Sequence, residues 1–480
     1  MKTKTAWSKY TAAQQKKVEE LAASYRDFLD NGKTERECVS QIVDRIEKEG
    51  YVELSEAIKA GKKLKTGDKV YAVNMEKSVI MFQVGKKPLE CGMNILGAHI
   101  DSPRVDIKQN PMYQDSDFVY LDTHYYGGIK KYQWVALPLA IHGVVVKKDG
   151  TTIIMNIGEE EEDPVFFISD LLPHLAADQM DKKGSKLIEG EALDVIVGNK
   201  PIKLTAAQIK AEAKKCEAAD EDEEKKDRFT REILRILQDE YGMEEEDFLS
   251  AELEVVPAGK AKEAGFDRSM ILAYGQDDRS CAFTSLEAML SVQKPEKTAC
   301  CILVDKEEIG SVGATGMESR FFENCVAELL DLCGGYNELV MRRALANSCM
   351  LSSDVSAGYD PSYASSFEKK NVAYLGHGMV FNKFTGSRGK SGSNDANAEY
   401  MAYIRSVMDT EKISYQTAEL GKVDQGGGGT IAYILSLYGM NVIDCGVAVL
   451  NMHAPWEATS KADLYETCLG YQAFLKAKGM

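Results

Sequence analysis

The stretch NILGAHID, residues 94–101, decides the fold, because an apolar run leads directly into His99 and Asp101. Such runs are typical of strands that are buried on both faces of a sheet. Four other apolar runs also end in polar side chains: SMILAYGQDD at 269–278, ACCILVDKEE at 299–308, SCMLSSD at 348–354 and CGVAVLNMH at 445–453. Ligands of open α/β sheets bind at the carboxyl ends of the strands. The sequence therefore predicts one sheet edge where these side chains gather.

The flanking patterns predict how the chain is divided. Residues 11–30 and 34–46 have the apolar spacing of helices, whereas 103–200 alternates in short segments separated by Gly and Asp, which is typical of a β-rich domain. From 252 onward, apolar runs alternate with amphipathic ones, which predicts an α/β sheet covered on both faces. We therefore predict a discontinuous catalytic domain, 1–102 with 252–480, and a β-rich insertion at 103–251. Within the insertion, the charged stretch 206–228 is expected to be an exposed loop or solvated helix.

Composition excludes several classes of protein. The 480 residues include 58 Lys and Arg against 75 Asp and Glu, a net charge of −17 that repels nucleic acid and anionic bilayers. No apolar run approaches the ~18–20 residues of a membrane span, and the first residues lack the apolar region of a signal peptide. The 11 cysteines form no Cys-x-x-Cys pair, so we expect reduced core residues of a cytoplasmic protein and assign none to catalysis.

Histidines and carboxylates coincide at the predicted edge. Only six histidines occur in the chain, and two of them, His99 and His453, fall at these strand ends beside four carboxylate positions. Two imidazoles and three carboxylates suit a pair of Zn²⁺-like ions that share one bridging carboxylate. Such ligands also accept Co²⁺ or Mn²⁺, so the native metal stays open.

Two local spacings refine this interpretation. In extended backbone, residues i and i+2 share a face, so Asp101 can support His99 by fixing its tautomer. Neighbouring residues of an extended segment face opposite ways, so one member of the Glu307–Glu308 pair can bind metal while the other faces the water to be deprotonated.

Five stretches carry a resemblance that spans nearly the whole chain. They are GAHIDSPR at 97–104, GQDDRSC at 275–281, DKEEIGS at 305–311, SSDVSAGYDPSY at 352–363 and NMHAPWE at 451–457. In this order they resemble the aspartyl aminopeptidase and vacuolar aminopeptidase I family of dinuclear zinc metallopeptidases. The resemblance implies a zinc-peptidase-like three-layer catalytic domain with an inserted lid domain, and an enzyme that removes the N-terminal residue of peptides.

The resemblance also implies roles for single residues. It makes Asp277 the bridging carboxylate, Glu307 the general base and Asp101 the carboxylate that supports a ligand. The remaining metal ligands that it implies are His99, Glu308, Asp354 and His453, with their division between two metals left open. The family further implies a tetrahedral dodecamer in which a lid histidine reaches a neighbouring active site. The segment LLPHLA at 171–176 makes His174 the candidate for that histidine.

Two segments depart from the family pattern and leave the substrate preference open. The tryptophan-rich segment reads YYGGIKKYQWVALPLAIHG at 125–143, and the stretch that supplies a substrate-binding Lys reads LGHGMVFNKFTGSRGK at 375–390. Lys383, the counterpart of that Lys, is displaced by one position, so either an acidic or a neutral first residue is compatible with the sequence. Two alternatives remain: a deacylase or carboxypeptidase of similar dinuclear fold, and a catalytically silent scaffold.

Overall fold

The computed structural model describes residues 4–203 and 221–479 and separates into two compact units. The first comprises Met1–Ser102 and Lys260–Met480, and the second comprises Pro103–Gly259. The predicted boundary at 251/252 differs from the observed one at 259/260, because the strand β10 (Ala251–Pro257) pairs with strands of the second unit. The charged stretch 206–228 lies outside the described residues up to 220, and its remainder opens the helix α6 (Glu221–Ile236).

The first unit is built on a nine-stranded mixed sheet. In spatial order its strands are β1 (Val52–Glu53), β2 (Lys69–Asn74), β3 (Ser78–Gln83), β13 (Thr298–Val304), β4 (Met93–His99), β14 (Cys349–Ser353), β18 (Asn441–Gly446), β16 (Met379–Asn382) and β17 (Tyr415–Ala418). The central strands β13, β4, β14 and β18 run parallel, so their carboxyl ends meet at one edge.

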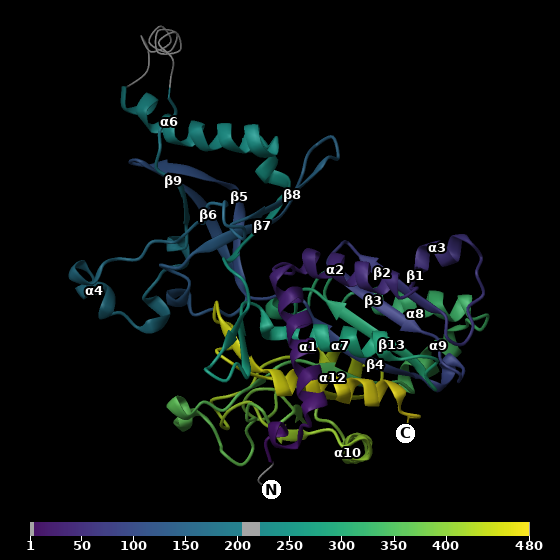
Figure 1. Ribbon diagram of the computed structural model, residues 1–480. Coiled ribbons are helices and arrows are strands. Elements are labelled where there is room, and N and C mark those ends of the chain that lie inside the picture. The colour runs from purple at the N-terminus through teal and green to yellow at the C-terminus, as the bar shows by residue number, and fades with distance from the viewer. Residues whose placement is uncertain (1–3, 204–220, 480) are drawn as a thin grey trace. The chain divides into compact units, whose positions relative to one another are not determined.

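Helices cover both faces of this sheet, which gives the three layers that the sequence predicts (Figure 1). One face packs against α1 (Ala12–Asp30), α2 (Glu35–Lys48), α7 (Gln276–Ser291), α10 (Ala398–Glu411) and α12 (Lys461–Lys476). The other packs against α3 (Leu54–Lys59), α8 (Phe321–Leu332), α9 (Glu338–Ala346) and α11 (Ala432–Ser436). Side chains of β4 alternate between the two cores, with Leu96 in one and Ile95 in the other, as a strand buried on both faces requires. Sequence signals set the helix starts: Thr11 and Thr34 each form a capping box at the first turn of α1 and α2.

A separate five-stranded sheet corrects the prediction of a single sheet edge. Its strands, in order, are β11 (Lys262–Ala264), β12 (Met270–Ala273), β20 (Glu457–Ser460), β19 (Ala448–Leu450) and β15 (Ser356–Ala357). Two of the five apolar runs, those that precede Asp277 and His453, contribute strands to this sheet as β12 and β19. Hydrophobicity marks a run as buried but does not say which sheet it joins, so the sequence could not separate them.

The second unit is an antiparallel six-stranded sheet with α6 along one face (Figure 1). Its strands, in order, are β8 (Thr152–Ile157), β7 (Leu139–Val146), β10, β5 (Arg104–Asp115), β6 (Phe118–Tyr126) and β9 (Val195–Gly198). The short helix α4 (Ala177–Met180) lies in the connection from β8 to β9. Across residues 4–203 and 221–479, no helix combines the length and apolarity needed to cross a bilayer.

Candidate metal centre

Strand register brings three of the predicted segments to one place. Val304 of β13 pairs with His99 of β4, so the Glu307–Glu308 turn begins beside His99. Ser352 of β14 pairs with Gly97 of β4, which puts Asp354, two residues further on, level with His99. These three side-chain groups therefore meet at the carboxyl edge of the parallel strands, where the sequence predicts a ligand site.

The five-stranded sheet delivers the other two residues. Asp277 lies in the first turn of α7, and the turn from β12 into that helix passes through Gly275 at a φ of 70°. A side chain at Gly275 would come within 2.2 Å of the Arg279 guanidinium, so the turn requires glycine. His453 follows β19 and also has a positive φ, of 66°. The turn conformations thus aim both side chains toward the ends of β4 and β13.

Asp277 stands between the two imidazoles. Its Oδ1 lies 3.3 Å from His99 Nε2, and its Oδ2 lies 3.2 Å from His453 Nε2. Glu308 Oε2 is 3.4 Å from the same nitrogen of His453. Possible ligand atoms approach within 4.8 Å of one another in three sets: His99 with Asp277 and Asp354, His99 with Glu307 and Glu308, and Asp277 with Glu308 and His453. The first and third sets share only Asp277, which is the arrangement that a bridging carboxylate requires.

Asp101 organises this cluster in two ways. His99 Nδ1 lies 3.0 Å from its carbonyl oxygen and 3.3 Å from its Oδ1, which leaves Nε2 facing Asp277. The two carboxylate oxygens of Asp101 also accept hydrogen bonds from the backbone N–H groups of Glu307 and Glu308, each at 3.2 Å. The prediction that this Glu pair is extended is wrong. The pair opens a 3₁₀ turn after Lys306, whose φ is 68°, and Asp101 binds that turn.

Electrostatics shows an excess of negative charge in a buried space. Burial raises the pKa of Glu307 to about 7 and those of Glu308 and Asp354 well above their usual range. Burial would lower the pKa of His99, but the carboxylates of Asp101 and Asp277 raise it well above its usual value. Burial would also raise the pKa of Asp277, yet the two imidazoles hold it well below its usual range. Two imidazoles do not balance this many carboxylates, so the cluster is suited to bound cations.

The donor set fits zinc. Imidazole nitrogens and carboxylate oxygens are common zinc ligands, and the shared Asp277 allows two ions to be held side by side. Glu308 Oε1 is buried and has no hydrogen-bond partner among the residues that the structure describes, which leaves it available as a ligand atom.

One further residue, Glu457, was not among the predicted site residues. It is buried, and its carboxylate accepts hydrogen bonds from the backbone N–H groups of Asp277, at 3.0 Å, and His453, at 2.6 Å. Glu457 therefore holds the backbone of Asp277 and His453 in place, as Asp101 holds the backbone of Glu307 and Glu308. The available signal was its position at the end of NMHAPWE, four residues after His453, but a carboxylate that binds backbone groups has no spacing pattern of its own.

The two predicted substrate-binding residues, His174 and Lys383, belong to different units. His174 is exposed on a 3₁₀ turn (Pro173–Leu175) of the second unit. Lys383 follows β16, which runs antiparallel to β18 and pairs Asn382 with Asp444 and Val380 with Gly446. The chain at Lys383 is therefore moving away from the edge that carries Asp354. Its ammonium group forms an ion pair with Asp395, which also binds Lys390 at 2.9 Å.

Comparison with known proteins identifies the family. The family described as aminopeptidase I zinc metalloprotease (M18) matches residues 28–475. The chain belongs to this family. A probable M18 family aminopeptidase 1 of Clostridium acetobutylicum is 59% identical over 472 residues, 98% of each chain. The crystal structure of aminopeptidase I from the same organism has a TM-score of 0.87 at 57% identity and 98% coverage of both chains.

More distant M18 structures preserve the fold. An M18 aminopeptidase from Thermotoga maritima gives a TM-score of 0.90 at 42% identity over 99% of both chains. The mApe1 dodecamer of S. cerevisiae gives 0.73 at 20% identity, covering 95% of this chain and 97% of that one, and shares the fold. The resemblance stated from the sequence is confirmed. The protein is a zinc aminopeptidase of the M18 family, and these relatives do not favour the deacylase, carboxypeptidase or scaffold alternatives.

Proposed function

We propose that this M18 aminopeptidase holds two metal ions per chain, with Asp277 as the bridging ligand. The observation that carries the proposal is that the two carboxylate oxygens of Asp277 face two different imidazoles, at 3.3 and 3.2 Å. Asp354 would complete the ligands on the His99 side, and Glu308 would complete those on the His453 side. When bound, two zinc ions lower the pKa of water and polarise the scissile carbonyl of the substrate.

In this proposal Glu307 is the general base. It takes the proton from the attacking water and passes it to the leaving amine of the peptide. Its exposure supports this role over that of ligand: the Glu307 side chain is 15% exposed and that of Glu308 3%. A proton shuttle must meet both water and the leaving group, whereas a ligand can be fully enclosed. Asp101 sets the position of both side chains through the N–H groups of their turn.

We infer that the first residue of the preferred substrate is uncharged. A pocket for Asp or Glu needs a fixed cation, since a buried carboxylate without a partner costs several kcal/mol, on the order of 3–5. The sequence offers three cations in FNKFTGSRGK: Lys383, Arg388 and Lys390. Both lysines are already paired with Asp395, and Arg388 is exposed rather than enclosed in a pocket. β16 also runs away from the sheet edge that carries Asp354, which further supports an uncharged first residue.

We also propose a homo-oligomer, a tetrahedral dodecamer, in which His174 of one subunit completes the site of another. The yeast relative that is described as a dodecamer supports the assembly. The exposed apolar side chains around His174 support a contact there, because Leu171, Leu172 and Leu175 are 45–68% exposed. The described cysteines are all unpaired, which supports a reducing compartment such as the cytoplasm.

A panel of unblocked and N-blocked peptides tests the proposed activity. The protein, stripped of metal by a chelator and then dialysed against Zn²⁺, Co²⁺ or Mn²⁺, should cleave unblocked peptides only. Metal analysis of the active form should give about two equivalents per chain. Full activity with less than one equivalent would contradict the two-metal proposal. Cleavage of N-blocked peptides at comparable rates would contradict the requirement for a free amine.

A further inference from the structure

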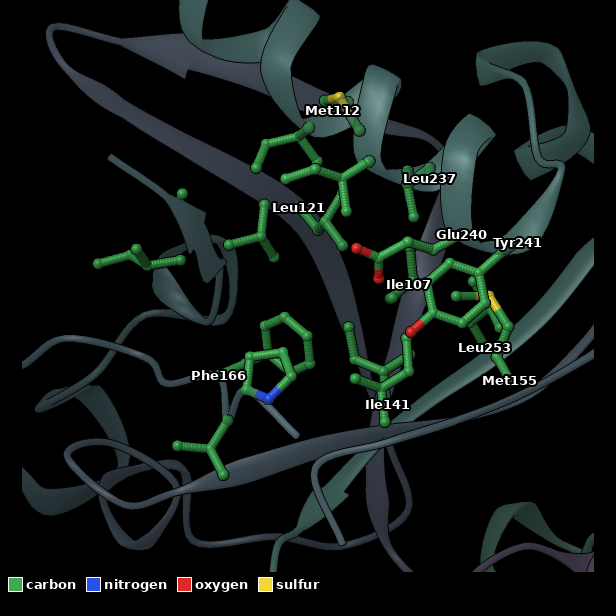
Figure 2. Close-up of a pocket in the computed structure, with 18 of the residues that line it drawn as sticks. Ile107, Met112, Leu121, Ile141, Met155, Phe166, Leu237, Glu240, Tyr241 and Leu253 are labelled. Carbon is green, nitrogen blue, oxygen red and sulfur yellow. The ribbon is translucent and has the colours of Figure 1, made fainter. Parts of the chain in front are cut away.

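The second unit contains an apolar cavity that has no part in the proposed reaction. Its volume is about 480 Å³, within the ~300–1,000 Å³ that small-molecule sites usually have. The sheet forms one wall, through side chains such as Ile107 of β5, Leu121 of β6 and Ile141 of β7 (Figure 2). The end of α6 and the π-helical turn that follows it, Leu237–Tyr241, form the opposite wall. The cavity thus lies wholly within one unit.

Two polar side chains, adjacent in sequence, point into this apolar space. Figure 2 shows the Glu240 carboxylate and the Tyr241 hydroxyl directed toward the side chains of the sheet. Neither side chain has a hydrogen-bond or ion-pair partner within the part of the chain that the structure describes. The third polar side chain of the lining, Asn199, is occupied, since its amide donates to the Asp117 carbonyl at 2.7 Å. Both free groups stand on a π-helical turn, an element that often occurs at functional sites.

The charges around the cavity favour a cation over an anion. Glu240 is the only charged residue in the lining. Arg235, the cation beside the turn, is already engaged by two carboxylates, since it lies 2.5 Å from Asp239 and 3.0 Å from Glu232. The nearby Lys147 is bound to the Gly242 carbonyl at 2.6 Å and lies 3.5 Å from Asp247. A fatty acid would place its carboxylate beside Glu240 with no cation to offset the repulsion, whereas an ammonium group would donate hydrogen bonds to both free groups.

We propose that this cavity binds a small apolar amine, with its hydrocarbon body between the sheet and α6 and its ammonium group at Glu240 and Tyr241. The ammonium donates to the carboxylate and to the phenol oxygen. Since Glu240 is exposed, the head group stays partly hydrated while the body is buried. The site is independent of the metal centre and of the proposed reaction.

Three probes with the same chain length test the proposal. Decylammonium, decanol and decanoate are titrated into the zinc-loaded, full-length protein by calorimetry, each below the concentration at which it aggregates. We expect saturable binding of decylammonium, tighter than that of decanol and about tenfold tighter than that of decanoate. Equal binding of amine and carboxylate overturns the proposal. Absence of saturable binding, including the case in which a second copy of the chain covers the cavity, also overturns it.

A matched pair of variants assigns the head-group contact. Glu240→Gln should abolish the preference for the amine over decanol, because it removes the charge at an exposed position without altering the fold. Asp239→Asn removes a charge from the same turn but outside the lining, and should keep that preference. Peptidase activity should be unchanged in both. If the preference survives in Glu240→Gln, or is lost equally in Asp239→Asn, the head group is not where we place it.

Methyl NMR locates the hydrocarbon body without any substitution. Met112 and Met155 line the cavity, whereas Met289 is buried in the core of the first unit. In protein labelled at the methionine methyl groups, decylammonium should shift the resonances of Met112 and Met155 and leave that of Met289 unchanged. Binding that leaves both lining methionines unshifted places the amine elsewhere and overturns the proposal.

Discussion

The metal centre and the apolar cavity of the second unit handle polar groups in opposite ways. At the metal centre, carboxylates from several strand ends are held by the protein itself: Asp101 and Glu457 each accept two backbone N–H groups and so fix Glu307, Glu308, Asp277 and His453. In the cavity, Glu240 and Tyr241 are neighbours on one turn and have no such support among the described residues. Buried charged groups need hydrogen bonds that hold them in place, whereas Glu240 is exposed and does not. Substitutions at the metal centre should therefore change peptidase activity much more than substitutions at the cavity do.

The largest effect is expected for Glu307→Gln. The amide keeps the size of the side chain but cannot accept the proton, so kcat should fall by about 10²–10⁴-fold while zinc content stays at the wild-type level. Steady-state kinetics with parallel metal analysis measures both. Near wild-type turnover would mean that another group is the base.

Glu308→Gln is the matched control, because it changes the neighbouring carboxylate on the same turn. Zinc retention should fall in this variant, and high zinc should restore part of the activity. If Glu307→Gln loses zinc and Glu308→Gln does not, the proposed roles of base and ligand are reversed.

His174→Ala tests whether the second unit takes part in the reaction at all. The substitution should lower kcat by about 10²-fold, a typical loss when one transition-state donor is removed. Because His174 is exposed, stability and zinc content should not change.

Donation between subunits is tested by mixing. A mixture of His174→Ala and Glu307→Gln subunits should gain activity after exchange, because some sites then combine His174 from one chain with Glu307 from the other. Proven subunit exchange with no gain in rate would argue that His174 acts only within its own chain.

Glu457→Gln should give a smaller loss, of about 10–100-fold in zinc affinity, as is typical for groups that orient metal ligands. A carboxylate accepts from both Asp277 N and His453 N, whereas an amide presents one acceptor and one donor. Competition with a chelator measures the affinity.

Glu466→Gln is the control, since Glu466 is a buried carboxylate that accepts a hydrogen bond from Ser414 N at 2.6 Å. This variant should lower the melting temperature without changing zinc affinity. Equal losses of zinc affinity in the two variants would mean a general loss of structure.

Much of the fold could be predicted because hydrophobic patterning acts locally. The apolar spacing at 11–30 and 34–46 corresponds to α1 and α2, and the run at 94–101 corresponds to β4. Sheet membership is different, because it depends on pairing between distant segments. The runs before Asp277 and His453 could therefore not be assigned to the five-stranded sheet from their composition.

The candidate site shows the same division. The spacing of His99 and Asp101 predicted their contact, since both lie in one short segment. That Asp101 also binds the turn of Glu307 and Glu308 follows from the pairing of β4 with β13, which no local pattern records. The conformation of that turn depends on the positive φ of Lys306. A lysine in the sequence does not predict a positive φ. Glu240 and Tyr241 carried no signal either, because their setting comes from the sheet beneath them.

The smallest effect is expected for Lys383→Met. An exposed ion pair contributes only about 0.2–1 kcal/mol, and the Lys383 side chain is 45% exposed in its pair with Asp395. Lys390 remains to balance Asp395 in the variant. The ratio of kcat/KM for peptides that begin with Glu to those that begin with Leu should therefore change by less than about twofold, and wild type should already favour Leu.

Lys390→Met, which removes the other partner of Asp395, is the matched control and should behave alike. A selective loss on the Glu peptide in Lys383→Met alone would show that the ammonium group leaves Asp395 to bind substrate. Lys383 would then act in substrate binding together with the residues of the metal centre, rather than as a surface charge.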